Sequence, residues 1–500
     1  QKTEKQQAFQ LLITQQKDFD ILFHNALIID GTGTPPYKAD LLVSGDSIAF
    51  IGAVDTAKIN VTQFIDASKR VLSPGFIDTH AHGDPLKTPE FKNFISMGVT
   101  TICLGQDGFS PEYKNLNEWI EKIEQTSSNP NIAMFTGHST LRILSGVGYN
   151  PEPDSVSLQK MADILKNHLN QGSFGLTTGL EYTPGTFAKS EELNYLAKVV
   201  GENGGMIMSH MRNEDDNAIE SSIKELLAQG KYCPVHISHL KVVYGKGKAR
   251  AEEILSLLSE ARAQGIAITA DIYPYTASFT GIGIVFPEWA KPPNNYNKVK
   301  QERRTELAAF LKNRVNKRNG PEATLFGTAP YRGKTLAEIA NEKDKSFELV
   351  LLEDIGPQGA SAAYFVMNEK LQSNLLKDSL TMVCSDGSPT MNHPRGYGSF
   401  SKIIDAYVVK DSLFSLPEAI RKMTYLPAQT LKINDRGKIA VGMKADLVLF
   451  NPTEVSSSAS FEKPHQLAKG FDMVVINGVI VKKNNIITSS KSGRILKKTD

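Results

Sequence analysis

The sequence has few cysteines, no excess of charge of one sign and no long apolar run, and each absence excludes a class of protein. Its cysteines, Cys103, Cys233 and Cys384, are too few for a disulfide framework, and each lies in an apolar run, so we expect buried free thiols, which a reducing compartment permits. Lys and Arg number 56 against 54 Asp and Glu, so no basic surface for nucleic acid or anionic membranes is expected. No run approaches the roughly 20 apolar residues of a transmembrane helix, which excludes a membrane span.

The length indicates several structural units. A chain of 500 residues exceeds what one hydrophobic core usually organises, so we expect two or three domains, or one barrel with additions. Hydrophobic residues make up 40% and charged residues 22%, which is typical of a folded globular protein. The chain begins with Gln1 rather than Met, which favours a removed leader and a periplasmic or exported protein; a trimmed chain and a cytoplasmic location are the alternatives. The oligomeric state is unknown from the sequence.

Both ends of the chain read as short antiparallel strands. Residues 19–71 alternate apolar runs with Gly and Pro turns, and residues 432–485 have the same texture. We therefore predict one small β-sandwich domain built from both ends. Residues 1–18 and 486–500 are expected to be tails.

The middle of the chain, residues 72–431, has a different pattern. Short apolar runs recur, each followed by a longer helix-like segment, which is the signature of βα units around a parallel sheet. Eight runs favour a (β/α)8 TIM barrel: 76–80, 100–104, 132–136, 174–178, 205–210, 234–239, 266–271 and 381–386. No Gly-x-Gly-x-x-Gly loop follows the first run, which argues against dinucleotide binding. About 110 residues separate the last two runs, and residues 283–345 are predicted to form a lid-like insertion.

Ionisable residues gather where the predicted strands end, which is where such barrels carry their catalytic groups. His80 and His82 end the first run and, two apart on an extended chain, point the same way. The other candidates follow later runs: Asp107, His138, His210, His239 and Asp386. A single strand-end Asp is often only a helix cap, but imidazole and carboxylate groups placed together favour Zn²⁺ or a similar divalent metal. His236, three residues before His239, is expected to face away from the barrel interior.

The residues around these positions resemble a known family. PGFIDTHAHGD (74–84) resembles the first-strand motif of the amidohydrolase superfamily. Further segments are similar to its D-aminoacylase (N-acyl-D-amino-acid deacylase) family: GVTTICLGQDGFS (98–110), GHSTLR (137–142), GLEYTPGTFA (179–188), SHMRNE (209–214), ISHLK (237–241), DIYPYTAS (271–278), CSDG (384–387) and HPRGYGSF (393–400). The resemblance implies a metal-dependent hydrolase with a (β/α)8 barrel and a β-sandwich made from both chain ends.

The resemblance also implies roles for individual residues. His210 and His239 match the histidine ligands of a tightly held zinc, and His80 and His82 line a second, weaker position. Asp386 matches the general base, and Tyr182 lies in the motif that lines the site of the acyl carbonyl. Four residues match those that hold the substrate carboxylate: Lys241, Tyr273, Ser278 and Arg395.

The sequence differs at two positions from proteins of the same superfamily. Where well-known family members have a zinc-binding Cys in a Gly-Asn-Cys-Gly loop, this sequence has Asp107. A carboxylate is a harder ligand than a thiolate, so the identity and number of the metals are open. Dihydroorotase- and hydantoinase-like relatives use a carboxylated lysine at the end of the fourth strand, and FGLTTGLEY has no lysine.

These residues predict hydrolysis of a small-molecule N-acyl-D-amino acid by metal-activated water. Asp386 would accept the proton of the water, and Tyr182 or His138 would stabilise the oxyanion. The preference for a D substrate comes from the resemblance alone. The alternatives are a D-residue dipeptidase, a cyclic-amide hydrolase, which the missing lysine disfavours, and a non-catalytic scaffold on the same fold.

Overall fold

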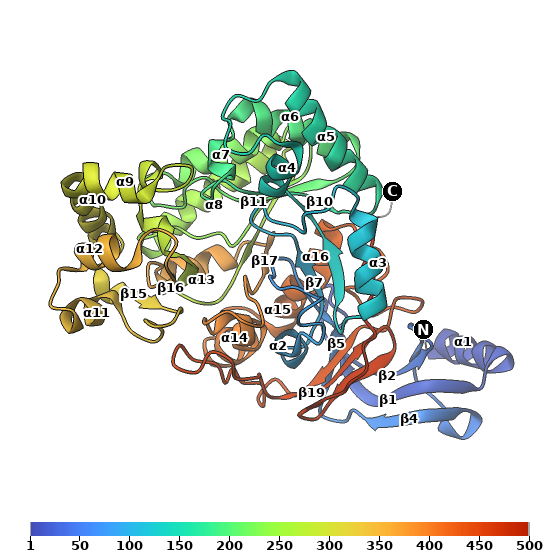
Figure 1. The fold of residues 1–500 in the computed structure, drawn as a ribbon. Helices are drawn as coiled ribbons and strands as arrows, with labels where there is room; N and C mark the ends of the chain where they lie inside the picture. Colours follow the sequence, from blue (N-terminus) through green and yellow to red (C-terminus); the bar gives the residue numbers. More distant parts are fainter. Residues whose placement is uncertain (1, 499–500) are drawn as a thin grey trace.

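The computed structural model describes residues 2–498, and its centre is a closed barrel of parallel strands (Figure 1). The strands, in order around the barrel, are β6 (Phe76–Asp78), β7 (Val99–Leu104), β8 (Asn131–Met134) with β9 (Thr136–Gly137), β10 (Gly175–Gly179), β11 (Met206–His210), β12 (Val235–Ile237), β13 (Ile268–Ile272) and β17 (Thr381–Val383). The barrel closes just beyond β17 and β6, where the Asp386 N–H donates to the His80 carbonyl at 2.8 Å. The predicted (β/α)8 fold is confirmed.

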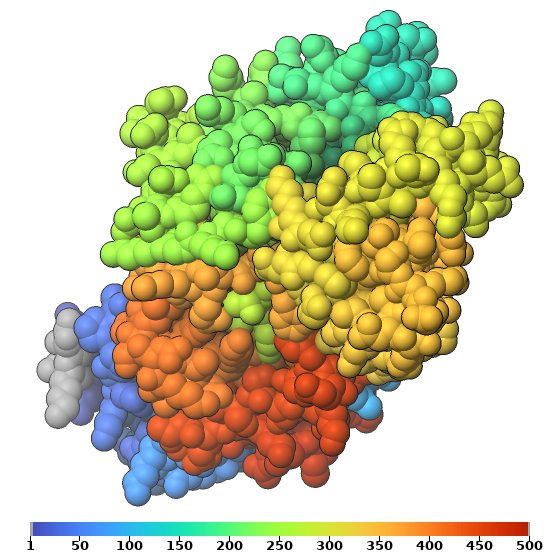
Figure 2. All heavy atoms as spheres, turned by 90° about the vertical axis from the view of Figure 1, so that its left-hand side faces the viewer, coloured from blue at the N-terminus to red at the C-terminus, as the bar shows by residue number. Residues whose placement is uncertain are grey.

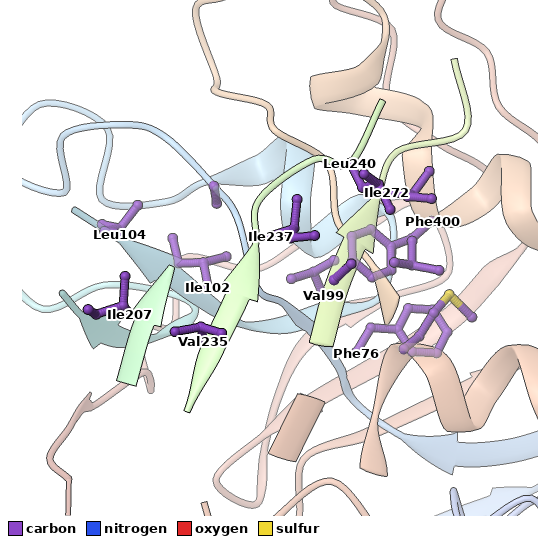
Figure 3. Close-up of a cluster of buried hydrophobic side chains, with 14 of the residues drawn as sticks. Phe76, Val99, Ile102, Leu104, Ile207, Val235, Ile237, Leu240, Ile272 and Phe400 are labelled. Carbon is purple, nitrogen blue, oxygen red and sulfur yellow. The ribbon is translucent and has the colours of Figure 1, made fainter. Parts of the chain in front are cut away.

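Helices cover the outside of the barrel because alternate strand residues are apolar on that face. In β11, Ile207 points outward to the helices, whereas Met206 and Met208 belong to a separate cluster inside the barrel. Figure 3 shows the outer layer, with Ile207 of β11 beside Val235 and Ile237 of the neighbouring strand β12. The covering helices are α2 (Lys92–Ser96), α3 (Leu116–Thr126), α4 (His138–Ser145), α5 (Ser155–Asn170), α6 (Ser190–Glu202), α7 (Ile219–Gln229), α8 (Gly247–Ala263), α13 (Glu369–Leu376), α14 (Arg395–Lys402), α15 (Leu416–Met423) and α16 (Tyr425–Thr430).

Both ends of the chain build one mixed nine-stranded sheet, as predicted for the sandwich domain. Its strands are β1 (Asp18–Ile28), β2 (Tyr37–Ser44), β3 (Ser47–Gly52), β4 (Asn60–Asp66), β5 (Val71–Pro74), β18 (Leu447–Phe450), β19 (Phe471–Ile476), β20 (Val479–Lys483) and β21 (Ile486–Ile487). The two ends join where β5 pairs antiparallel with β18, and Phe23, Val43 and Leu447 share a buried core there. The sheet lies beside the barrel at the lower right of Figure 1.

The two predicted tails are folded instead. Helix α1 (Lys2–Gln15) packs on the sheet through Phe9 and Ile13, and the Phe9 ring lies 5.2 Å from that of Phe50. At the other end, β22 (Ile495–Leu496) pairs in parallel with β8 and so becomes part of the barrel wall. Both expectations were wrong because each segment has only two or three apolar residues in a polar stretch. Such a segment folds only by packing against parts of the chain that are distant in sequence.

The insertion is larger than predicted and has its own sheet and core. Strands β14 (Ser278–Gly281), β16 (Ser361–Tyr364) and β15 (Thr324–Phe326) form an antiparallel sheet, so the unit extends beyond residues 283–345 on both sides. Its helices are α9 (Tyr296–Glu302), α10 (Arg304–Lys317), α11 (Leu336–Glu342) and α12 (Phe347–Leu349). In Figure 2 this unit, yellow to light orange, lies between the green barrel segments and the red C-terminal segments.

Two features of composition are also visible in the structure. Cys103, Cys233 and Cys384 are buried and free of disulfides, as predicted. Between residues 2 and 498, no helix combines the length and the apolar character that crossing a membrane requires.

Candidate metal centre and active site

A cavity of about 390 Å³ opens at the carboxyl ends of the barrel strands, beside the insertion. Its wall is largely charged or hydroxyl-bearing on the barrel side: His82, Gln106, Asp107, Glu181, Tyr182, His210, Glu214, His239, Lys241, Tyr273, Asp386 and Arg395. The remaining wall comes from Phe109, Val243, Met391 and the insertion residues Ser278, Phe279, Thr280, Ile284 and Arg318. The cavity therefore joins a cluster of ionisable groups to a partly apolar wall.

Three groups of potential metal ligands lie at this cavity; Glu181, His210 and Glu214 form one of them, and the remaining two share Asp107. One of these two is His80, His82, Asp107 and Asp386, and the other is Asp107, His210 and His239; in each, the ligand atoms lie within 4.8 Å of one another. The Oδ1 atom of Asp107 lies 3.2 Å from His239 Nε2 and 3.6 Å from His210 Nδ1, while its Oδ2 atom lies 3.4 Å from His82 Nε2. Asp107 thus faces both positions with its two oxygens.

The backbone turns sharply at the strand ends to aim these side chains inward. Asp107, His239 and Asp386 have φ angles of +55°, +39° and +47°, in the left-handed region that non-glycine residues rarely adopt. Gly179 in β10 allows the loop to approach, because a Cβ atom there would lie 2.0 Å from the Asp107 carbonyl oxygen. Such strained positions are typical of functional sites.

The prediction that His236 faces away from the barrel interior was wrong. Strand β12 ends at Ile237, and the left-handed backbone of His239 breaks the alternation on which the prediction relied. His236 Nε2 lies 2.9 Å from Asp271 Oδ2 below the site. The other Asp271 oxygen accepts the backbone N–H of His239 at 2.5 Å, so the pair supports the position of His239.

Two carboxylates that the sequence analysis did not assign support the histidines. Glu181 Oε2 lies 3.1 Å from His210 Nε2, and Glu214 Oε1 lies 3.1 Å from His239 Nδ1. In both histidines the opposite ring nitrogen faces Asp107. Carboxylates in this position commonly fix the tautomer and orientation of metal-binding histidines. The sequence did offer a signal for both: Glu181 directly precedes Tyr182, and Glu214 ends the SHMRNE motif.

The electrostatics of the cluster favour a bound cation. Burial lowers the pKa of His80, and neither of its ring nitrogens has a hydrogen-bond partner within residues 2–498, which leaves neutral nitrogens available. Burial would also lower the pKa of His210, but Glu214, Asp107 and Glu181 outweigh it and raise the pKa to about 10. Burial would raise the pKa of Asp107, but His80, His210 and His239 hold it well below its usual value. A divalent metal can replace protons held in such a field.

Cationic residues lie next to the metal cluster. Arg395 Nη1 is 2.9 Å from Asp386 Oδ2, and its guanidinium lies over the Tyr273 ring, 4.7 Å from the centroid. Lys241 Nζ donates to both Glu214 oxygens at 2.9 Å. Burial would raise the pKa of Asp386, but Arg395 and then His239 outweigh it, so this carboxylate is ionised over the working pH range. Tyr182 and Ser278 also line the cavity.

His138 is not part of the cavity, in contrast to its predicted role at the oxyanion. It begins helix α4, where its Nε2 atom lies 2.7 Å from Glu192 Oε1 in α6. Arg142 Nη1 lies 2.5 Å from the other oxygen of Glu192. Because β9 passes directly into α4, the imidazole turns toward the helix layer and forms a buried structural cluster there.

Comparisons with known proteins agree with this geometry. Residues 372–482 match a family model described as "Amidohydrolase family". An N-acyl-D-glutamate deacylase of Alcaligenes xylosoxydans xylosoxydans is 31% identical, and the alignment covers 97% of each chain. The N-acyl-D-glutamate deacylase of Bordetella bronchiseptica, solved with zinc and a phosphonate inhibitor that mimics its tetrahedral intermediate, superimposes with a TM-score of 0.84 at 28% identity over 96% of this chain and 100% of that one. A D-aminoacylase with a binuclear metal centre gives a TM-score of 0.82 at 31% identity over the same shares.

The barrel, the sheet from both chain ends and the shared His/Asp cluster define a metal-dependent amidohydrolase. The similarity to the deacylases extends over nearly the whole chain and identifies the family within this class. The chain belongs to the D-aminoacylase family, the N-acyl-D-amino-acid deacylases of the amidohydrolase superfamily.

Proposed function

We propose that the protein hydrolyses the amide bond of N-acyl-D-amino acids and releases a carboxylic acid and a free D-amino acid. One observation carries this proposal: a cavity of about 390 Å³ combines the His/Asp metal cluster with the cations Lys241 and Arg395. A small N-acyl amino acid offers an amide carbonyl to the metal cluster and a carboxylate to the two cations. The D configuration is carried over from the relatives described above.

The donor set fits a divalent metal. Four neutral or proton-replaceable imidazoles and two carboxylates match Zn²⁺ and similar ions, and the orphaned nitrogens of buried His80 would gain a partner. We propose that Asp107, His210 and His239 hold one ion tightly, while His80, His82, Asp107 and Asp386 offer a second, weaker position. The zinc and the binuclear centre of the two related structures support this assignment. When bound, the metal would lower the pKa of water and polarise the amide carbonyl.

Asp386 is the general base in this proposal. Its carboxylate lies 3.0 Å from His82 Nε2 and pairs with Arg395, so it is ionised and can accept a proton from the attacking water. The same group would then deliver that proton to the departing amine. Tyr182, whose ring centroid lies 4.5 Å from that of His210, would donate a hydrogen bond to the oxyanion. Burial raises the pKa of Tyr182 well above its usual value, which keeps the phenol protonated.

The α-carboxylate of the substrate would bind at the cationic side of the cavity. The guanidinium of Arg395 can hold a carboxylate in a bidentate arrangement, and Lys241 adds a point charge. Tyr273 is buried between them, with Lys241 and Arg395 both over its ring, and its hydroxyl has no protein partner within residues 2–498. Ser278 would complete the set with a second hydroxyl.

The test is hydrolysis of paired N-acetyl-D- and N-acetyl-L-amino acids by metal-reconstituted protein, followed through the free amine. We expect turnover of D substrates only, and a loss of at least about 10³-fold in kcat for Asp386→Ala. Asp84→Ala is a matched control, because this carboxylate is 43% exposed and outside the main cavity. Turnover of neither enantiomer by a protein shown to contain metal would refute the substrate assignment.

A further inference from the structure

One cation of the cavity has no role in the reaction described above. Arg318 follows helix α10 of the insertion, and its side chain is 4% exposed while lining the same cavity as the metal cluster. It is therefore a buried charge that reaches the cavity wall from a different structural unit than Lys241 and Arg395.

The charge of Arg318 is only weakly compensated by the protein. Its nearest carboxylate is Asp215, at 3.5 Å from Nη1, but Asp215 already forms a much closer ion pair with Arg314. The Nε atom of Arg318 is buried and has no hydrogen-bond partner in the described part of the chain. The guanidinium lies over the Tyr364 ring, 5.3 Å from the centroid. A buried arginine with an unused N–H is costly unless a ligand supplies an acceptor.

The carboxylates of the cavity face groups other than Arg318. Glu181 shares the cavity, but its Oε2 atom faces His210 Nε2. Arg395 pairs with Asp386, and Lys241 with Glu214, on the barrel side. An N-acyl derivative of a neutral amino acid brings only one carboxylate, which the barrel cations can bind. It would leave Arg318 without an anion.

We propose that Arg318 binds a second carboxylate, at the end of the substrate side chain, so that the enzyme prefers N-acyl derivatives of acidic D-amino acids. Val243 and Ile284, which line the cavity with Arg318, would contact the methylene groups between the two carboxylates. The inference rests on the proposed function and names its substrate class. Arg318 would act on specificity and would leave the chemical step to the barrel residues.

The test compares isosteric pairs of substrates that differ only in side-chain charge. Metal-loaded wild-type protein should hydrolyse N-acetyl-D-glutamate with a kcat/KM at least about tenfold above that for N-acetyl-D-glutamine. Arg318→Gln should remove most of this preference by raising KM for the acidic substrate, with kcat little changed. Arg318→Lys should restore part of it. The aspartate and asparagine pair measures which side-chain length the cavity fits.

Lys317→Gln is the matched control, because Lys317 directly precedes Arg318 but lines a different hollow. It should keep the preference for the acidic substrate. An equal or greater kcat/KM for N-acetyl-D-glutamine in the wild type would overturn the inference while leaving the deacylase function intact. Equal losses on both substrates in Arg318→Gln would also overturn it. Absence of turnover on all D substrates by metal-loaded protein would instead refute the proposed function, and the inference with it.

Discussion

Among single residues, Asp107 is the one that faces both of the proposed metal positions. Its two oxygens face two ligand groups, whereas a cysteine at this place would offer a single sulfur atom. Carboxylate oxygen is a hard ligand, and thiolate selects softer ions such as Zn²⁺. With Asp107 as a ligand, as proposed above, the position would accept a wider range of divalent ions than one with cysteine.

We predict that Asp107→Cys makes the centre more selective for zinc. When metal-free protein is offered equal Zn²⁺ and Mn²⁺, the ratio of bound zinc to manganese should rise on the order of tenfold. Elemental analysis after gel filtration measures this ratio. Ser110→Cys places a thiol on the same loop outside both ligand groups and should behave as the wild type. An unchanged ratio in Asp107→Cys would show that Asp107 is not a ligand.

The sequence could locate strand-end side chains but not their partners. His80, His82, Asp107, His210, His239 and Asp386 share one end of the barrel because parallel strands present their carboxyl ends together. The orientation of His236 was mispredicted because a left-handed residue interrupts the alternation. Arg318 left no signal, since its approach to the cavity depends on how the insertion folds back over the barrel.

At the scale of elements, the barrel strands were predictable and the two chain ends were not. A strand of five buried residues that begins with three apolar ones, such as β11, is visible in the sequence because it carries its own pattern. The two-residue strand β22 has no such pattern, and its position depends on the free edge of β8. Arg494 N–H, which donates to Asn131 Oδ1 at 3.0 Å, and Gly493 N–H, which donates to the Ser128 carbonyl at 2.9 Å, extend the same contact.

Removing β22 should destabilise the barrel. A chain that ends at Ser490 loses the pairing with β8 and exposes a strand edge, so we expect the free energy of unfolding to fall by about 2–4 kcal/mol. Calorimetry or urea titration measures the change. A chain that begins at Lys17 is the comparison, because it loses α1 from the outer sheet and leaves the barrel wall intact. Equal stability of the Ser490 chain and the full chain would contradict a structural role for β22.

At the scale of the whole molecule, the active site lies between units that the chain builds separately. The barrel supplies the proposed metal ligands, and the insertion supplies Ser278, Ile284 and Arg318 from a unit with its own core. The unequal spacing of strands was enough to predict an insertion. Its true limits were not readable, because β14 and β16 pair across some 80 residues of intervening chain.

Metal removal should loosen the barrel as a whole, because the proposed ligands come from the ends of β6, β7, β11, β12 and β17. A ligand that binds only the folded state stabilises it by about 2.7 kcal/mol at a concentration one hundredfold above its Kd. We therefore expect a chelator to lower the melting temperature of metal-loaded protein and added Zn²⁺ to restore it. His239→Asn, which lacks one ligand of the tight position, should respond much less. A melting temperature that is indifferent to chelator, in protein shown to contain metal beforehand, would mean that the ion does not tie these strands together.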